Sequence, residues 1–112
     1  MQIPNADRAV IEPPKLHGYL LSRSHPIGRF KAAFFLSLGY SAESWPRLED
    51  DLRAHLSRDA IPDEPTRYGQ KYMIRATLVG PSGRAAEVVS VWVVRTGEDF
   101  PRFVTAYPEA GG

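Results

Sequence analysis

Hydrophobic residues recur at helical spacing in the first half of the chain and at alternate positions in the second half. Pro26 suits the first turn of a helix, and Gly39 suits the left-handed position just beyond the last turn. Between them, at about 100° per residue, one arc of a helix would hold five apolar residues: Ile27, Phe30, Phe34, Phe35 and Leu38. The pattern predicts a helix over residues 26–38.

A second helix is predicted over residues 46–56, because Trp45, Leu48, Leu52 and Leu56 again follow helical spacing. Before the first helix, prolines at positions 4, 13 and 14 interrupt any periodicity. Residues 1–14 are therefore expected to form a flexible or loosely docked arm or linker. Residues 16–21 are expected to form a short extended piece.

From residue 68 onward the hydrophobic period changes to two, which is typical of strands. Strands are predicted over 68–79, 84–95 and 102–107, with a turn at 80–83 and loops at 58–66 and 96–101. This order predicts an α+β fold in which two N-terminal helices pack on one face of a three- to four-stranded antiparallel sheet. Residues 15–108 are expected to form one domain, followed by a tail at 109–112.

The alternation also predicts which strand residues face away from the helices. The set Val89, Val91 and Val93 is uniformly apolar and is assigned to the buried face. The exposed face would then combine basic, hydroxyl and aromatic side chains, as single-stranded RNA requires: Lys71, Arg75, Thr77, Ser90, Trp92, Phe103, Thr105 and Tyr107. The alternative is a second hydrophobic face in which the N-terminal arm covers Trp92.

Two polar residues accompany the first predicted helix. Lys31 falls inside its apolar arc, so its side chain either reaches past the core edge to water or belongs to a site. His25 precedes the helix, where free N–H groups and the positive end of the dipole favour anions. His25 is equally suited to cap the helix. Together the pair suggests a place that could hold a phosphate.

Charge is distributed unevenly, although the net charge is only +1. Residues 15–40 carry four basic side chains and no acidic one, and residues 67–95 carry five basic side chains and one glutamate. The segment between them is acidic, which predicts a basic face for a polyanion and an acidic back. The chain has no cysteine, which excludes disulfides and thiolate catalysis. It also has no apolar run long enough to span a membrane.

Several motifs resemble a family of small uncharacterised bacterial domains that occur alone and at the C-termini of polymorphic contact-dependent toxins. The matching blocks are His25-Pro26-x-Gly28-x-x-Lys31-Ala32-x-Phe34-Phe35, Trp45, Gly80-Pro81-x-Gly83-Arg84, Val91-Trp92 and Val104-Thr105-Ala106-Tyr107-Pro108. That family in turn resembles the barnase/EndoU/RelE-like ribonucleases, in which N-terminal helices precede a four-stranded antiparallel sheet that carries the active site.

The resemblance implies metal-independent RNA cleavage with no cofactor, in which the ribose 2′-OH attacks the adjacent phosphate. It implies catalytic roles for four residues: His25 as base or acid, Lys31 on the charged transition state, Thr105 on a phosphate oxygen, and Tyr107 as proton donor or base-stacking ring. The expected RNA-binding residues are Arg29, Lys71, Arg75, Trp92 and Arg95. Free RNA such as tRNA is the expected substrate, since the net charge is small for a ribosome-bound nuclease.

Two functions therefore remain open from the sequence. The first is a ribonuclease toxin that acts in the cytoplasm, alone or delivered as the C-terminal domain of a secreted toxin, with a cognate antitoxin or immunity protein as partner. The second is a non-catalytic antitoxin or immunity-type module that binds a partner through the acidic run Glu49-Asp50-Asp51. A metallohydrolase is disfavoured, because the three histidines are dispersed and no carboxylates pair at ligand spacing.

Overall fold

The computed structural model describes residues 1–109, apart from the Phe30 side chain, and residues 110–112 of the predicted tail lie outside them. Three short helical segments come first: η1 (Ala6–Arg8), α1 (Pro13–Lys15) and the π-helical turn η2 (Leu16–Leu20). Two longer helices follow, α2 (Arg29–Ser37) and α3 (Trp45–His55). The remaining elements are strands: β1 (Ala60–Pro62), β2 (Gly69–Val79), β3 (Ala85–Arg95) and β4 (Pro101–Pro108).

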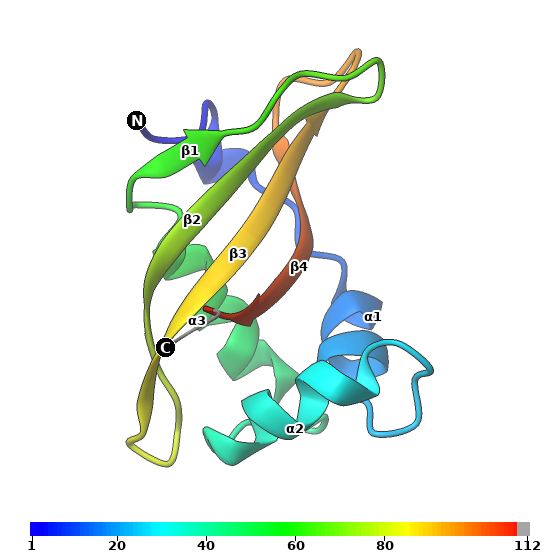
Figure 1. Cartoon of the computed structure of the whole chain (residues 1–112), viewed down its shortest axis with the longest axis vertical. Helices are drawn as coiled ribbons and strands as arrows, with labels where there is room; N and C mark the ends of the chain where they lie inside the picture. The colour runs from blue at the N-terminus through cyan, green and yellow to red at the C-terminus, as the bar shows by residue number, and fades with distance from the viewer. Residues whose placement is uncertain (110–112) are drawn as a thin grey trace.

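The four strands form one antiparallel sheet in the order β1-β2-β3-β4, so consecutive strands are neighbours throughout. The helices gather on one side of this sheet (Figure 1). Two N-terminal helices on one face of an antiparallel sheet is the α+β architecture that the sequence predicts, and it is confirmed. The short strand β1 falls in a segment expected to be a loop; it pairs with the middle of β2, from Tyr72 to Ile74.

Both predicted helices are present, with different starts. The first begins at Arg29 rather than at Pro26, and residues 26–28 form turns. It ends as expected, because Gly39 adopts the left-handed backbone conformation with φ of 99°. Its buried face carries Ala32, Phe35 and Leu38, whereas Ile27 from the predicted apolar arc is 65% exposed.

The predicted faces of the sheet are right for β2 and wrong for β3. In β2 the residues Tyr72, Ile74, Ala76 and Leu78 are buried, as predicted. In β3, however, the fully buried residues include Ser90 and Trp92, the pair assigned to the exposed face. Register explains the difference: Tyr72 pairs with Trp92 and Ile74 pairs with Ser90, and directly paired residues lie on the same face. The valine set of β3 therefore lies on the opposite face of the sheet, where Val89 is still only 6% exposed and Val91 and Val93 are half-buried.

The predicted faces of β4 are also partly wrong, because the strand contains a register shift. The pairing between β3 and β4 slips at Val91/Trp92, so that Trp92 pairs with Phe103 while Val91 pairs with Thr105. Phe103 and Ala106 are both buried although they are three residues apart, which strict alternation forbids. Phe103 thus packs edge-on against Trp92, with ring centroids 5.3 Å apart, instead of lying on the exposed face.

Residues 1–14, expected to be a flexible or loosely docked arm, are packed against the domain. Ile3, Ala9 and Ile11 belong to the buried core. Val10 forms backbone hydrogen bonds on both sides to β4: its N–H donates to the Pro101 carbonyl, and its carbonyl accepts from Phe103, each at 2.9 Å. These contacts extend the sheet beyond β4 by one parallel bridge, so the segment covers an edge that would otherwise be open.

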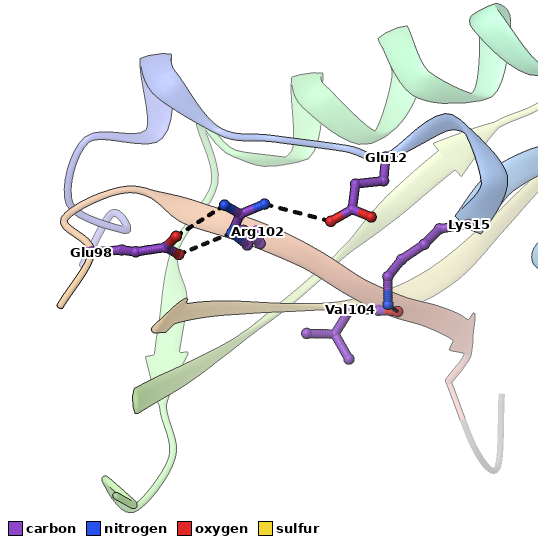
Figure 2. A network of polar contacts seen from close by, with 5 residues as sticks. All are labelled: Glu12, Lys15, Glu98, Arg102 and Val104. Carbon is purple, nitrogen blue, oxygen red and sulfur yellow. Dashed lines mark hydrogen bonds and ion pairs between the residues drawn. The ribbon is translucent and has the colours of Figure 1, made fainter. Parts of the chain in front are cut away.

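Ion pairs fasten the same segment to the loop before β4. Arg102 makes two hydrogen bonds of 2.9 Å to the carboxylate of Glu98 and lies 3.5 Å from that of Glu12 (Figure 2). Further along, the Lys15 side chain reaches β4, where its Nζ is 3.4 Å from the Val104 carbonyl oxygen (Figure 2). The N-terminal segment therefore fixes α1 and η2 beside the C-terminal half of β4.

Candidate functional site

Three polar side chains meet where α2 and η2 approach the edge strand β4. The Nζ of Lys31 donates to the Tyr19 hydroxyl oxygen at 2.7 Å and to the Thr105 Oγ1 at 2.9 Å. The two hydroxyl oxygens are themselves 3.4 Å apart. We call these three residues the Lys31 cluster. It joins Lys31 and Thr105, two of the four residues predicted to be catalytic, across 74 positions of sequence.

A pocket of about 440 Å³ opens beside the Lys31 cluster. It contains Tyr19 and Thr105 of the cluster, together with His25, and no carboxylate side chain is among its lining residues: Pro14, Lys15, Gly18, Tyr19, His25, Val104 and Thr105. With Lys15 in its wall and Lys31 bonded to two of its hydroxyls, the pocket is suited to an anionic group.

The local chain geometry explains how Tyr19 reaches Lys31. Tyr19 lies on η2, where the Leu21 N–H donates to the Leu16 carbonyl five residues back, at 2.9 Å. Gly28 at the start of α2 packs directly on this turn: a Cβ at position 28 would lie 2.3 Å from the Tyr19 carbonyl oxygen. Only glycine permits this approach, so the glycine of the His-Pro-x-Gly block sets the spacing between Tyr19 and α2.

His25 lines the pocket, and one of its two ring nitrogens is engaged by the backbone. Its Nδ1 accepts hydrogen bonds from the backbone N–H groups of Ile27 and Gly28, at 3.1 and 2.9 Å. An acceptor nitrogen carries no hydrogen, so in this arrangement the ring hydrogen is on Nε2. His25 therefore caps the turn at residues 26–28 that leads into α2, rather than the helix itself, and these two N–H groups are not left open for an anion.

The electrostatic surroundings lower the pKa of Tyr19. Burial alone raises the pKa of its phenol, but the hydrogen bonds with Lys31 and Thr105 and the positive charges of Lys31 and Lys15 outweigh burial. The pKa of Tyr19 is therefore lower than that of an ordinary tyrosine. The Tyr19 ring also contacts His25 edge-on, with centroids 5.0 Å apart.

The other predicted site residues lie elsewhere. Tyr107 lines a separate pocket of about 210 Å³ on the outer face of the sheet, with Arg75 as a neighbour. The Arg75 guanidinium forms a 2.9 Å ion pair with Glu109. Lys71 and Arg95 line a third pocket at the other end of β2, together with Asp63 and Glu64, and Arg29 lines a fourth, on α2.

Trp92 was predicted to lie on the exposed face of the sheet and to bind RNA there, and this placement is wrong. It is fully buried, so it offers no ring face to a base. Its Nε1 donates to the Ser90 Oγ at 2.9 Å, and the Nδ1 of His55 lies 3.4 Å from the same oxygen. We call His55, Ser90 and Trp92 the His55 cluster. Burial lowers the pKa of His55, and its Nε2 is buried without a hydrogen-bond partner.

Sequence reasoning missed Tyr19 and Lys15 as site residues. Tyr19 falls in the stretch expected to be a short extended piece, Lys15 lies just before that stretch, and neither belongs to a matching motif block. Gly28 was the available signal, since a glycine in the first turn of an amphipathic helix often marks the close approach of another backbone.

Two searches over the described residues 1–109 add to this description. No group of three or more histidine, aspartate or glutamate side chains there is arranged to hold a metal ion. No helix in that range is both long enough and apolar enough to cross a bilayer.

Comparison with known proteins places the chain in a family. The model of the family described as a domain of unknown function (DUF6883) matches residues 2–110, so the chain belongs to that family. None of the curated proteins matches it. A solved structure that resembles it comes from a contact-dependent growth inhibition toxin–immunity protein complex of Klebsiella pneumoniae 342. That match has a TM-score of 0.69 and 22% sequence identity, and covers 95% of this chain and 97% of the other, which indicates a shared fold.

Proposed function

From the likeness of its fold to a chain of a contact-dependent growth inhibition toxin–immunity protein complex and from the Lys31 cluster, we propose that the chain is a metal-independent ribonuclease toxin. In the proposed reaction the ribose 2′-OH attacks the adjacent phosphorus, which produces a 2′,3′-cyclic phosphate and a free 5′-OH. The observation that carries the proposal is the position of the Lys31 ammonium, hydrogen-bonded to two hydroxyls of a pocket whose lining residues include a second lysine and no carboxylate.

The chemistry asks for positive charge and hydrogen-bond donors at the phosphorane, where negative charge accumulates. Lys31 supplies the charge at the cluster, and the Thr105 hydroxyl is placed to bond a phosphate oxygen. His25 supplies a further donor, because its hydrogen is held on Nε2 while Nδ1 accepts from the backbone. This assigns His25 to phosphate binding rather than to proton abstraction.

The remaining residues expected to bind RNA line pockets other than the one beside the Lys31 cluster. Arg29, Lys71, Arg75 and Arg95 are proposed to bind the backbone of a longer RNA, and Arg75 would first have to leave Glu109. Tyr107 is proposed to stack on a base at the outer face, rather than to transfer a proton, because it lines a pocket other than that of Lys31.

A toxin of this kind needs an inhibitor in the cell that makes it. The similar structure is a complex that contains both a toxin and an immunity protein, so its likeness alone is compatible with either role. We favour the toxin because the acidic run of α3, the surface expected of an immunity-type module, is largely paired within its own helix. Glu49 bonds Arg53 at 3.0 Å, and Asp51 bonds Arg47 at 3.2 Å.

The proposal is tested by incubating the purified chain with total RNA in the presence of EDTA and analysing the new RNA ends. We expect cleavage that survives EDTA, with 2′,3′-cyclic phosphate on one side of each cut and 5′-hydroxyl on the other. We also expect growth arrest on expression without a neutralising partner. Intact RNA in the presence of folded protein would contradict the ribonuclease and favour the immunity-type module.

A further inference from the structure

The direction of the hydrogen bonds in the Lys31 cluster leaves the phenol hydrogen of Tyr19 with only a long hydrogen bond inside the cluster. A lysine ammonium has three donors and no acceptor, so Lys31 donates to the Tyr19 oxygen at 2.7 Å and not the reverse. The phenol hydrogen of Tyr19 must therefore point to another acceptor. Within the cluster the alternative is Thr105 Oγ1, at a long 3.4 Å; a bound substrate oxygen could replace it.

His25, the residue expected from the sequence to transfer protons, is less suited to that task. Its Nδ1 lone pair is occupied by two backbone N–H groups, and its Nε2 keeps the hydrogen. Nδ1 could take part in proton transfer only by giving up both of its bonds to the backbone turn before α2. The neighbouring phenol of Tyr19 is therefore the better candidate for the proton donor.

We propose that Tyr19 is the general acid of the cleavage reaction, and that it protonates the departing 5′-oxygen of the RNA. This rests on the proposed ribonuclease function. A lone pair of the 2′-oxygen forms the new bond to phosphorus while the P–O5′ bond breaks and its electron pair goes to O5′. The 2′-OH proton is released to solvent water, and O5′ takes the phenol proton of Tyr19. The Tyr19 phenolate then regains a proton from water.

Two properties of the pocket suit a phenol to this role. Tyrosine holds its proton at neutral pH, so the acid is present in its active form. Once the proton has left, the phenolate lies 2.7 Å from the Lys31 ammonium, and Lys15 adds positive charge nearby. The lowered pKa of Tyr19 reflects the same stabilisation of the phenolate, which makes proton donation easier.

The test compares Tyr19→Phe with the wild-type chain on two substrates of the same sequence. One is ordinary RNA, and the other carries sulfur in place of the bridging 5′-oxygen at the cleaved position. A thiolate leaves without protonation, so this substrate does not need the acid. On ordinary RNA we expect cleavage to fall about 10²- to 10⁴-fold, the usual contribution of a general acid. On the sulfur substrate we expect the variant to come within about tenfold of the wild-type chain, since the lost contribution is no longer needed.

Tyr72→Phe serves as the matched control, because it removes a phenol from a buried residue of β2 that does not line the pocket. Far-ultraviolet circular dichroism and thermal unfolding of both variants confirm folding. If Tyr19→Phe loses the same factor on both substrates while the wild-type chain cleaves normally, Tyr19 positions Lys31 and is not the acid. If the wild-type chain cleaves neither substrate, the ribonuclease function and the acid role are both overturned.

Discussion

The Lys31 cluster and the His55 cluster contain similar groups and differ in their surroundings. Each joins a basic side chain of a helix to a hydroxyl of a strand and to an aromatic ring with a polar atom. The Lys31 cluster lies at the sheet edge beside an open pocket, and its residues are half-buried. The His55 cluster lies between α3 and the sheet, and all three of its residues are at most 3% exposed.

Because of this difference, we expect the His55 cluster to contribute mainly to stability and the Lys31 cluster mainly to activity. The His55 cluster is sealed in the core, where Trp92 fills a buried position, so substitutions there should chiefly change stability. The Lys31 ammonium, at an open edge, retains part of its hydration, so removing this group should change the free energy of unfolding little. It can instead act on a ligand that displaces water. Substitutions in the two clusters should therefore have opposite profiles of stability and activity, and the predictions below run from the largest expected stability effect to the smallest.

Trp92→Ala should cost about 3–5 kcal/mol of unfolding free energy, because it removes a fully buried indole and leaves a cavity beside Phe103. Urea denaturation followed by circular dichroism measures the change. Ile61→Ala is the control: Ile61 is 62% exposed on the outer side of β1, and we expect a change within about 0.5 kcal/mol. Similar small losses for both variants would mean that Trp92 is not in the core.

Gly28→Ala should destabilise the fold by about 1–3 kcal/mol, because the added methyl group meets the Tyr19 carbonyl and forces α2 away from η2. The displacement also separates Tyr19 from Lys31, so RNA cleavage should fall together with stability. Thermal unfolding provides the measurement. The control is Gly18→Ala, at which a Cβ would meet nothing within 4 Å. A stable Gly28→Ala protein would show that the close contact is absent.

His55 should make folding pH-dependent in mildly acidic solution. Its pKa is lowered by burial in the folded chain, so the unfolded chain binds a proton first as the pH falls. The contribution of His55 to the free energy of unfolding should therefore be fully present above the pKa of the unfolded chain, about 6.5. At lower pH it should decline, by about 1.4 kcal/mol for each unit by which the folded and unfolded pKa values differ.

The measurement is urea denaturation from pH 7.5 to 5. The loss of unfolding free energy over this pH range should be smaller in His55→Gln than in the wild-type chain. It should be unchanged in His17→Gln, since His17 is exposed. A His55→Gln protein whose stability follows the same pH curve as the wild-type chain would refute this assignment.

The outline of the fold follows from patterns that the sequence displays. The period-two run of β2, with Tyr72, Ile74 and Leu78 inward, and the helical spacing of Leu48 and Leu52 in α3 both predict buried positions that the structure confirms. Gly39 likewise marks the end of α2. In each of these segments one face is clearly more apolar than the other, so periodicity alone selects the buried side.

The failures come where both faces carry apolar residues or where partners are distant in sequence. In β3, alternate positions hold valines on one side and Trp92 on the other, and only the register with β2 decides between them. Ser90 is tolerated inside because His55, 35 residues earlier, and Trp92 approach its hydroxyl. The bulge in β4 then shifts the alternation by one residue, which no local pattern indicates.

The site was predicted in part for the same reason. Lys31 was conspicuous because a lysine within an apolar arc needs a polar partner, and Thr105 belonged to a motif block. Tyr19, the third member, lies on a π-helical turn in a stretch without periodicity. Its position depends on the docking of residues 1–14 against β4, for which the sequence offered no signal.

Lys31→Met tests the central claim most directly, with the exposed Arg58→Met as a charge-matched control. Because Lys31 is half-buried at an open edge, we expect its unfolding free energy to change by no more than about 1 kcal/mol. Its rate of RNA cleavage, measured beside the wild-type chain on the same RNA, should fall at least about 10²-fold, since a charged donor to the phosphorane is lost. Arg58→Met should cleave as the wild-type chain does. Equal cleavage by Lys31→Met and Arg58→Met would contradict the assignment of the Lys31 cluster as the active site.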